Sequence, residues 1–464
     1  MNGWHQHDQR RLVPMRRAVI SVAALLVALL APVRLDAQGG PTTLQFSFSN
    51  PGARSLGMGG AFAAVADDAT AAFANPAGLT QLTRPEVSLE ARYWDYRTPY
   101  TVGGRVSGQP TGIGLDTPIQ QSESEYDTSA LSFLSFVYPG RRWTLALSRH
   151  QSAKFFTSTR TQGLFTDDPW DDPQPTCLPD TEVCRYPDFA RSTDVSIVST
   201  TASFAYRVTD VISLGIGVSY FQGDLMMVQQ PYVLIAETLP DGFFGPNAYH
   251  LEAHYGTGEY HWDGSDLGFN LGILWSLNRQ WSLGGFFRQG GELTGNALEF
   301  SGPALDPPYP VGTIATSESG IPGKIPDVYG LGVAYRSQDG SWTGSFEWDR
   351  VRYSQFLTSI GSSESINTRY VALDDVNELR LGIEYAFLQW SPLVALRGGV
   401  WRNPDHAIRS FEDDPLEQAL LPGGKDKIHF SLGVGIVLKN LQIDLACDAS
   451  DLVNTAALSL IYQF

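Results

Sequence analysis

The sequence predicts an all-β protein, a 14-stranded antiparallel transmembrane β-barrel whose lumen is plugged by an N-terminal segment with short helices. Three observations support this fold class. From residue 86 onward, segments of about ten residues alternate between apolar and polar side chains, the length of a tilted membrane-spanning strand. The connections between these segments are alternately short and long. The composition is rich in aromatic residues (12%) and glycine (46 residues) and poor in charged residues (17%).

Composition and charge exclude several other classes of protein. The mean hydropathy of -0.13 is too polar for a membrane protein built of helices. A hydrophobic content of 43% is too high for a disordered chain. The formal net charge of -17 argues against a nucleic-acid partner, because nucleic acids are bound through basic surfaces.

The N-terminus reads as a signal peptide covering residues 1–37. An apolar run over residues 18–33 is too short for a comfortable transmembrane helix, and Leu35-Asp36-Ala37 offers a cleavage site. The run is preceded by Arg10, Arg11, Arg16 and Arg17. We therefore expect an exported chain whose residues 38–85 form a plug and whose residues 86–464 form the barrel.

Fourteen strands are predicted from the period-two alternation. They begin near residues 86, 129, 142, 194, 211, 266, 281, 326, 342, 376, 392, 427, 441 and 454. The short connections are 139–141, 207–210, 277–280, 337–341, 387–391 and 439–440. The long ones are 97–127, 153–193, 226–265, 292–325, 356–374 and 403–425. Short periplasmic turns that alternate with long external loops are typical of a barrel in the bacterial outer membrane, and a soluble sandwich has no reason to keep that phase.

Aromatic residues and the C-terminus agree with this arrangement. Tryptophan and tyrosine flank the short turns, where they would form an interfacial girdle. These residues are Tyr138, Trp143, Tyr206, Trp275, Trp281, Tyr335, Trp342, Tyr385 and Trp390. The last strand places Leu458, Leu460, Tyr462 and Phe464 on one face. A terminal Phe464 resembles the signal by which the barrel assembly machinery recognises outer-membrane barrels.

Charged residues fall on the predicted inward face of several strands. Arginine facing lipid near the midplane costs about 2 to 4 kcal/mol, so these side chains must point to the lumen. They are Glu90, Arg92, Glu347, Asp349, Glu378, Arg380, Glu384, Arg397, Asp444 and Asp448. Two interpretations stay open: a ladder of salt bridges that braces the wall, or contacts to a ligand.

The segment 38–85 lacks the strand pattern and is rich in glycine and alanine. Asp67 and Asp68 can cap a short helix that runs through Ala74, and Pro76 ends it. Small side chains let such a segment pack inside a confined space. A 14-stranded barrel leaves an open lumen unless something fills it, so we expect the segment to act as the plug.

Three motifs in this segment resemble a known family. They are G-A-R-S-L-G-M-G-G-A-F at 52–62, A-D-D at 66–68 and N-P-A-G-L at 75–79. Their order is similar to the N-terminal hatch of the FadL family of outer-membrane transporters for long-chain fatty acids and other hydrophobic compounds. The resemblance covers residues 46–464 and implies a monomeric barrel without cofactor. The residues that match the hatch are Gly57, Gly59, Gly60, Asp67, Asp68, Asn75, Pro76 and Ala77.

The resemblance also implies a function, which is passive uptake without an energy source. A hydrophobic ligand would be caught by the external loops, pass to a pocket beside the hatch, and leave sideways into the outer-membrane lipid through a gap in the wall. Apolar loop residues are candidates for the capture surface. We expect this role for Phe155, Phe156, Phe165, Phe243 and Phe244. The alternative is a barrel of this type that docks or shuttles components for protein secretion, which predicts a sealed wall.

The remaining chemical motifs are weak. Cys177 and Cys184 lie seven residues apart and could form a small disulfide in an oxidising compartment, or remain free thiols. No metal site is expected, because two cysteines do not make a zinc site and no H-E-x-x-H occurs. His150-Gln151-Ser152 resembles the H-x-S spacing of outer-membrane phospholipase, but no asparagine partner is identifiable. We therefore expect no enzyme activity.

Overall fold

The computed structural model describes most of the chain after the predicted signal peptide. The described residues are 48–107, 118–167, 176–177, 184–186, 188–235, 251–254, 256–301, 313–361, 371–411, 415–421 and 423–464. The predicted signal peptide, residues 1–37, lies outside them. Among the described residues, none of the helices is long and apolar enough to cross a membrane.

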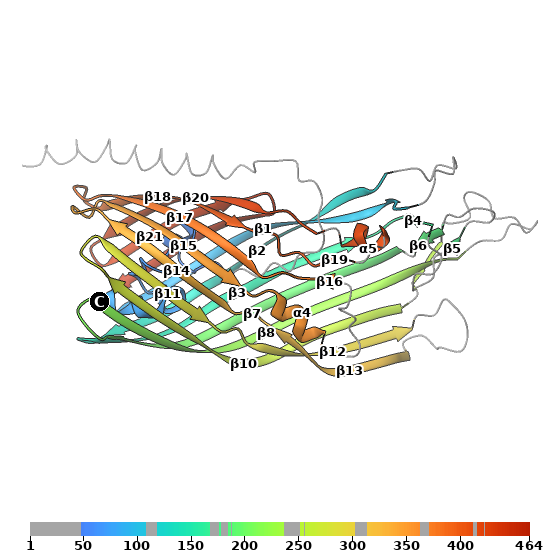
Figure 1. The fold of residues 1–464 in the computed structure, drawn as a ribbon, viewed down its shortest axis with the longest axis horizontal. Helices are drawn as coiled ribbons and strands as arrows, with labels where there is room; N and C mark the ends of the chain where they lie inside the picture. The colour runs from blue at the N-terminus through green and yellow to red at the C-terminus, as the bar shows by residue number, and fades with distance from the viewer. Residues whose placement is uncertain are drawn as a thin grey trace, which may run out of the picture. The chain divides into compact units, whose positions relative to one another are not determined.

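The wall is a closed antiparallel β-barrel of 14 strands, as the sequence predicts (Figure 1). Twelve of the 14 positions in the wall are each occupied by a single strand. These strands are β1 (Glu86–Arg105), β2 (Gln120–Pro139), β3 (Trp143–Arg160), β7 (Asp188–Arg207), β8 (Ile212–Ile235), β10 (Gly256–Ser276), β15 (Trp342–Val351), β17 (Val376–Phe387), β18 (Leu393–Asn403), β20 (Lys427–Leu438), β21 (Leu441–Ala449) and β22 (Val453–Gln463). Strand β22 pairs with β1, from Glu86 opposite Gln463 to Tyr96 opposite Val453, which closes the barrel.

Two of the 14 wall positions are each divided into two strands. β11 (Trp281–Arg288) is followed by β12 (Glu292–Ser301), and both pair with β10. The next position consists of β13 (Thr313–Lys324) and β14 (Val328–Arg336), which pair with β12 and β11 respectively. The predicted strand starts near 281 and 326 correspond to β11 and β14.

The long external connections are shorter than the sequence predicts, because the strands continue past the apolar alternation. β1 extends to Arg105 and β2 begins at Gln120, inside the predicted loop 97–127. β3 likewise extends to Arg160. Outside the hydrocarbon layer the outward face of a strand no longer meets lipid, so the apolar alternation disappears while the backbone pairing persists. Figure 1 shows β8, β10, β12 and β13 reaching well beyond the ends of β14, β15 and β17.

Side chains on the two faces of the wall have the predicted partition. In β20, His429 and Ser431 are buried, whereas Phe430 between them is 66% exposed. The aromatic girdle faces outward beside the short turns: the rings of Trp281 and Tyr335 lie 4.9 Å apart, and other exposed members are Tyr138, Trp143, Tyr206, Trp275, Trp342 and Trp390. Such a belt matches the water interface of a bilayer.

Smaller elements belong to the plug and to the loop end of the barrel. The plug contains α2 (Ala53–Gly57), α3 (Ala71–Ala74) and the 3₁₀ helix η1 (Pro76–Gln81). The loop elements are β4 (Leu164–Thr166), β5 (Thr176–Cys177), β6 (Cys184–Tyr186), β9 (Leu251–His254), α4 (Ser354–Ile360), β16 (Val371–Ala372), β19 (Arg409–Ser410) and α5 (Pro415–Leu420). The plug positions the site described next.

Candidate functional site

The described part of the plug, residues 48–85, lies inside the barrel and is called the hatch. Almost every residue from 50 to 80 is buried. The tight turn after α2 needs glycine, because Gly59 and Gly60 have φ of 64° and 76°. Its hydrogen bonds run from Gly60 N–H to the Ser55 carbonyl (2.9 Å) and from Asn50 Nδ2 to the Gly60 carbonyl (3.0 Å).

Asn75 links two parts of the hatch to each other and to the wall. Its Nδ2 donates to the carbonyl of Ala63 in the hatch (2.8 Å) and to that of Ile273 in β10 (3.0 Å). Its Oδ1 accepts from Ala77 N–H (3.2 Å) and so caps η1, while Pro76 occupies the first position of that helix. The sequence-predicted helix therefore does end before Pro76. A fully buried asparagine with these three bonds fixes where the hatch lies against β10.

Glycine in the wall makes room for the hatch backbone. A Cβ added at Gly272 of β10 would lie 2.2 Å from Asn75 Oδ1, and one at Gly399 of β18 would lie 2.2 Å from Gly59 N. The same holds, at 2.2 to 2.3 Å from hatch backbone atoms, for Gly215, Gly284 and Gly382. The hatch motif and the inward glycines of five strands are thus parts of one packed surface.

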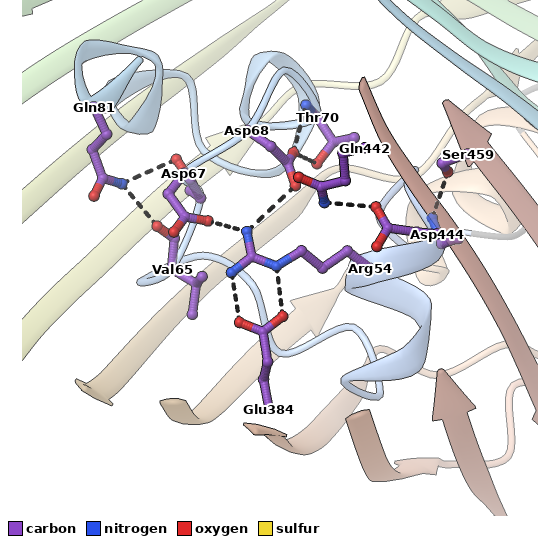
Figure 2. A network of polar contacts seen from close by, with 12 residues as sticks. Arg54, Val65, Asp67, Asp68, Thr70, Gln81, Glu384, Gln442, Asp444 and Ser459 are labelled. Carbon is purple, nitrogen blue, oxygen red and sulfur yellow. Dashed lines mark hydrogen bonds and ion pairs between the residues drawn. The ribbon is translucent and has the colours of Figure 1, made fainter. Parts of the chain in front are cut away.

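Arg54 is the centre of a polar network between the hatch and the wall (Figure 2). It donates from Nε and Nη2 to the two carboxylate oxygens of Glu384 in β17, both at 2.9 Å. Its Nη1 lies 2.5 Å from Asp67 Oδ1 and 3.8 Å from Asp68 Oδ2. Glu384 also accepts from Arg397 of β18 (2.6 Å). A bidentate arginine and carboxylate pair that excludes water holds the hatch firmly in one position.

The two adjacent aspartates of the hatch differ in their environment. Burial raises the pKa of Asp67, but the positive charges of Arg54 and Arg336 outweigh burial and hold this pKa below its usual value. For Asp68, burial dominates and raises the pKa from 3.8 to about 6. Asp68 Oδ1 accepts from the N–H of Thr70 (2.9 Å), just before α3. Neither aspartate caps α3 directly, because the residue preceding that helix is Thr70; the expected cap is therefore wrong for Asp67 and indirect for Asp68.

The predicted inward charges are buried and paired with each other or with the hatch. Arg92 lies 2.9 Å from Glu90, and Arg397 lies 2.6 Å from Asp444. Arg380 pairs with Asp349 (3.1 Å) and Glu378. Glu347 instead accepts backbone hydrogen bonds from Phe62 (2.7 Å) and Ala63 (2.6 Å) of the hatch. These contacts support the first interpretation, in which the charges brace the wall, and add that some of them anchor the hatch; contact to a ligand stays a prediction.

A pocket lies inside the barrel beside the start of the hatch. It encloses about 670 Å³ of empty space, including its open mouth. Aromatic side chains from four different strands or their ends line it, together with glycine backbone of the hatch. The lining includes Trp94, Tyr96, Tyr353, Glu378, Arg380, Trp401, Asn403, His429 and Asp448, with Phe48, Ser49 and Asn50 of the hatch.

The wall is interrupted between β2 and β3. These strands pair only from Pro139 opposite Thr144 to Phe133 opposite His150, although both continue for ten residues or more toward the loops. Each carries a one-residue bulge at this point, at Ser132 in β2 and at Ser152 in β3, and both serines are buried. Bulges end pairing and redirect side chains.

Side chains bridge this interruption, which is called the seam below. Arg149 donates to the Leu131 carbonyl (2.8 Å) and Lys154 to the Ser129 carbonyl (3.0 Å). On the inner side, the ring of His150 lies 4.2 Å from that of Phe73 in the hatch. Phe155 of β3, past the bulge, lies 6.0 Å from the ring of Tyr96 in the pocket wall. The pocket, the hatch and the seam are therefore neighbours.

Sequence comparison then identifies the family. The model of the family described as outer membrane protein transport protein (OMPP1/FadL/TodX) matches residues 182–450, more than half of the chain. The chain belongs to this family. It is accordingly an outer-membrane protein, and its relatives are transport channels.

Solved structures of FadL/TodX proteins share the fold at low sequence identity. A FadL homologue of Pseudomonas aeruginosa is 16% identical with a TM-score of 0.61, over 92% of this chain and 100% of that one. The toluene transporter TbuX of Ralstonia pickettii is 16% identical with a TM-score of 0.54, over 90% and 99%. The toluene transporter TodX of P. putida is 15% identical with a TM-score of 0.54, over 90% and 99%. No curated protein matches the sequence.

The expected capture residues of this FadL/TodX protein are dispersed. Phe155 and Phe156 lie in strand β3 rather than in the predicted loop 153–193, because β3 continues past its bulge, and Phe155 is only 2% exposed. Phe165 lies in the short strand β4. Phe243 and Phe244 lie outside the described residues. Phe155 therefore belongs to the interior, beside the pocket and the seam.

Three other predictions concern chemical motifs outside the hatch and the pocket. The hydroxyl of Ser152 lies 3.5 Å from His150 Nδ1, and the His150 ring is flanked by Phe73 and Phe133. Among the described residues, no cluster of three or more histidine, cysteine or acidic side chains could hold a metal ion. The backbone of β5 and β6 places Cys177 directly opposite Cys184, and their disulfide stays a prediction.

Sequence reasoning missed the role of Arg54 and the position of the seam. Arg54 was part of the matched motif, but its partner Glu384 lies 330 residues away, which no local pattern reveals. The seam had a visible signal. The polar run His150-Gln151-Ser152 interrupts the alternation of β3, and all three residues are buried.

Proposed function

We propose that this protein mediates passive uptake of hydrophobic compounds across the outer membrane, with long-chain fatty acids and monoaromatic hydrocarbons as the two candidate classes. The ligand would enter among the external loops, occupy the pocket beside the hatch, and leave through the seam into lipid. Apolar ligands need no energy source for the last step, because transfer from water to hydrocarbon is favourable. The observation that carries this proposal is the interruption between β2 and β3 beside the hatch.

An apolar path supports the route from pocket to seam. Buried apolar side chains inside the barrel form a continuous cluster that includes Trp94, Tyr96, Ala153, Phe155 and Tyr353. Tyr96 and Tyr353 line the pocket, and Ala153 follows the bulge of β3. A ligand that moves along this cluster remains out of water until it reaches the seam.

The alternative role in protein secretion predicts a sealed wall. The shortened pairing of β2 and β3 favours transport instead. A monomeric state, and recognition of Phe464 by the barrel assembly machinery, are further parts of the proposal. The Phe464 side chain is 60% exposed, and its N–H donates to the Pro85 carbonyl (3.0 Å) beside the first strand.

Deleting Ser152 tests the route. In the wild type, Gln151 faces Val198 of β7 and Ala153 faces Ile197, with Ser152 bulged between them. Without Ser152, β3 can pair with β7 without a break. We expect liposomes that contain the deletion variant to lose uptake of labelled oleate and toluene, while the variant still folds as a barrel.

The matched control is Ser152→Ala, which keeps the bulge and should keep uptake. Equal uptake by the deletion variant would contradict exit at the seam. Wild-type uptake no faster than through liposomes with an unrelated, empty barrel would contradict transport altogether. Loss of lipid hydrolysis in Ser152→Ala, if any hydrolysis is seen, would instead favour the hydrolase reading of the H-x-S motif.

A further inference from the structure

The charges that line the pocket are unbalanced toward the acidic side. Among the described lining residues, two carboxylates, Glu378 and Asp448, face one guanidinium, Arg380. A carboxylate ligand needs a cation with free donors, or it must be desolvated against like charge, which is strongly unfavourable at low dielectric. The question is therefore whether Arg380 can serve a ligand.

Arg380 donates to protein groups from each of its three guanidinium nitrogens. Its Nε donates to Asp349 (3.1 Å), its Nη2 to Glu378, and its Nη1 to the Gly59 carbonyl of the hatch (3.4 Å). Its guanidinium lies 4.3 Å from the centre of the Trp401 ring, and the side chain is 3% exposed. Arg380 is therefore neutralised by two carboxylates and covered by an indole.

The neighbouring cation, Arg92, bonds the protein through both of its terminal nitrogens, while its buried Nε has no hydrogen-bond partner among the described residues. Arg92 lies behind the pocket residues Ser49 and Asn50, to which it donates at 3.1 Å each, and it pairs with Glu90. Its side chain is 2% exposed. It is therefore screened from the pocket by the start of the hatch.

Asp448 lies at the opposite side of the pocket with both of its carboxylate oxygens hydrogen-bonded. It accepts from Trp401 Nε1 (3.0 Å) and from Ser431, and lies 2.6 Å from His429 Nδ1. The rings of His429 and Trp401 stack at 3.9 Å. The carboxylate thus orients a flat aromatic surface toward the empty space.

We propose that Glu378 and Asp448 are specificity-determining residues that make this pocket accept uncharged aromatic compounds and reject carboxylates. The proposal rests on the uptake function above and narrows its ligand class. Trp94, Tyr96, Tyr353 and Trp401 supply aromatic faces, which prefer to contact other rings. The buried Oδ1 of Asn403 has no hydrogen-bond partner in the described structure and could accept from a phenolic hydroxyl.

Three ligands of nearly equal shape test this charge filter: toluene, 4-methylphenol and 4-methylbenzoate. Binding is measured by calorimetry on the full-length protein in lipid nanodiscs at about pH 8, where the benzoate is ionised and the phenol is not, with empty nanodiscs as the blank for partition. We expect 4-methylbenzoate to bind at least about tenfold more weakly than toluene, because it meets the two carboxylates without a free cation. The phenol should bind at least as well as toluene.

Removing one carboxylate provides the decisive comparison. In Glu378→Gln the amide oxygen can still accept from Arg380, but one negative charge is gone, so the affinity ratio of 4-methylbenzoate to toluene should rise about tenfold. Asp448→Asn should shift the ratio in the same direction and serves if the first variant does not fold. The matched control is Asp426→Asn, which removes a carboxylate whose exposed partner is Arg402, outside the pocket, and should leave the ratio unchanged.

A failure of the charge filter can be distinguished from a failure of the proposed uptake function. Equal binding of 4-methylbenzoate and toluene by the wild type, or an unchanged ratio in both folded pocket variants, would overturn the charge filter and leave uptake intact. Binding of none of the three ligands would overturn the role of the pocket in uptake and the filter with it.

Discussion

Arg54 in the hatch and Glu384 in β17 form a bidentate ion pair with both hydrogen bonds at 2.9 Å. The side chains are only 12% and 10% exposed. Such a pair contributes little net stability compared with apolar residues, but removing Arg54 takes away two of the hydrogen bonds to the buried Glu384 and leaves it with Arg397 alone. The pair therefore fixes the hatch at one position against β17.

Truncation of Arg54 should release the hatch without unfolding the barrel. We expect Arg54→Ala to lower the free energy of local hatch opening by about 1 to 3 kcal/mol, because Glu384 then keeps only Arg397 and Asp67 keeps only Arg336 as a charged partner. Hydrogen exchange of amides in residues 53–60 measures this. Arg402→Ala removes an exposed pair with Asp426 and should change stability by less than about 1 kcal/mol. Unchanged hydrogen exchange in Arg54→Ala would refute the conclusion that this ion pair holds the hatch in place.

The hatch should be held more tightly in acid than at neutral pH, because of Asp68. Its pKa is 3.8 unfolded and about 6 in the folded protein. The folded hatch therefore favours the protonated form of Asp68. The resulting contribution to the stability of the hatch is full below pH 3.8 and is lost as the pH rises through about 6. The difference corresponds to about 3 kcal/mol at most. The pH dependence from Asp67 has the opposite sign. Its ionised form stabilises the folded hatch, and this contribution is lost as the pH falls through its lowered pKa.

Asp68→Asn isolates this effect, because asparagine remains uncharged and can still accept from Thr70. Hydrogen exchange of residues 70–74 is compared between variant and wild type at the same pH, so that intrinsic exchange rates cancel. We expect equal protection at about pH 4 and better protection of the variant at about pH 8. Better protection at both values, or at neither, would show that the charge of Asp68 is not responsible.

The register of β5 and β6 makes the disulfide prediction specific. Directly opposed residues of an antiparallel pair are close enough for an S–S bond when the pair is of the non-hydrogen-bonded type. We expect one free thiol, Cys447, in protein purified without reductant, and three after reduction. Alkylation followed by mass spectrometry counts them. Three reactive thiols before reduction would mean that Cys177 and Cys184 are free.

The strand positions were predictable because the bilayer imposes a period of two over a fixed length. In β20 this pattern alone places Phe430 toward lipid and His429 toward the lumen. The pattern stops where the strand leaves the membrane. The stretch Gln120 to Thr128 of β2 is polar on both faces, so sequence reasoning took it for a loop, although it pairs with β1 throughout.

The site was less predictable, since its geometry depends on pairs that are distant in sequence. The hatch motif could be recognised, but its seat is formed by Gly272 and Glu384, more than 190 residues downstream. The seam depends on two single-residue bulges, at Ser132 and Ser152, and a bulge offsets register without changing composition. Only contact between strands shows that pairing ends there.

A methyl group on the wall should displace the hatch where the two are packed most closely. A Cβ at Gly272 would lie 2.2 Å from Asn75 Oδ1 and 2.8 Å from the Pro76 ring, so Gly272→Ala must push Asn75 away from its bonds to Ala63 and Ile273. We expect a cost of about 1 to 3 kcal/mol for hatch closure and a measurable ion conductance in planar bilayers, because an unseated hatch leaves the lumen open. Gly344→Ala on β15 is the matched control, since an added Cβ there has no atom within 4 Å. It should remain non-conducting, and equal conductance of the two variants would show that the effect is not caused by the contact with Asn75.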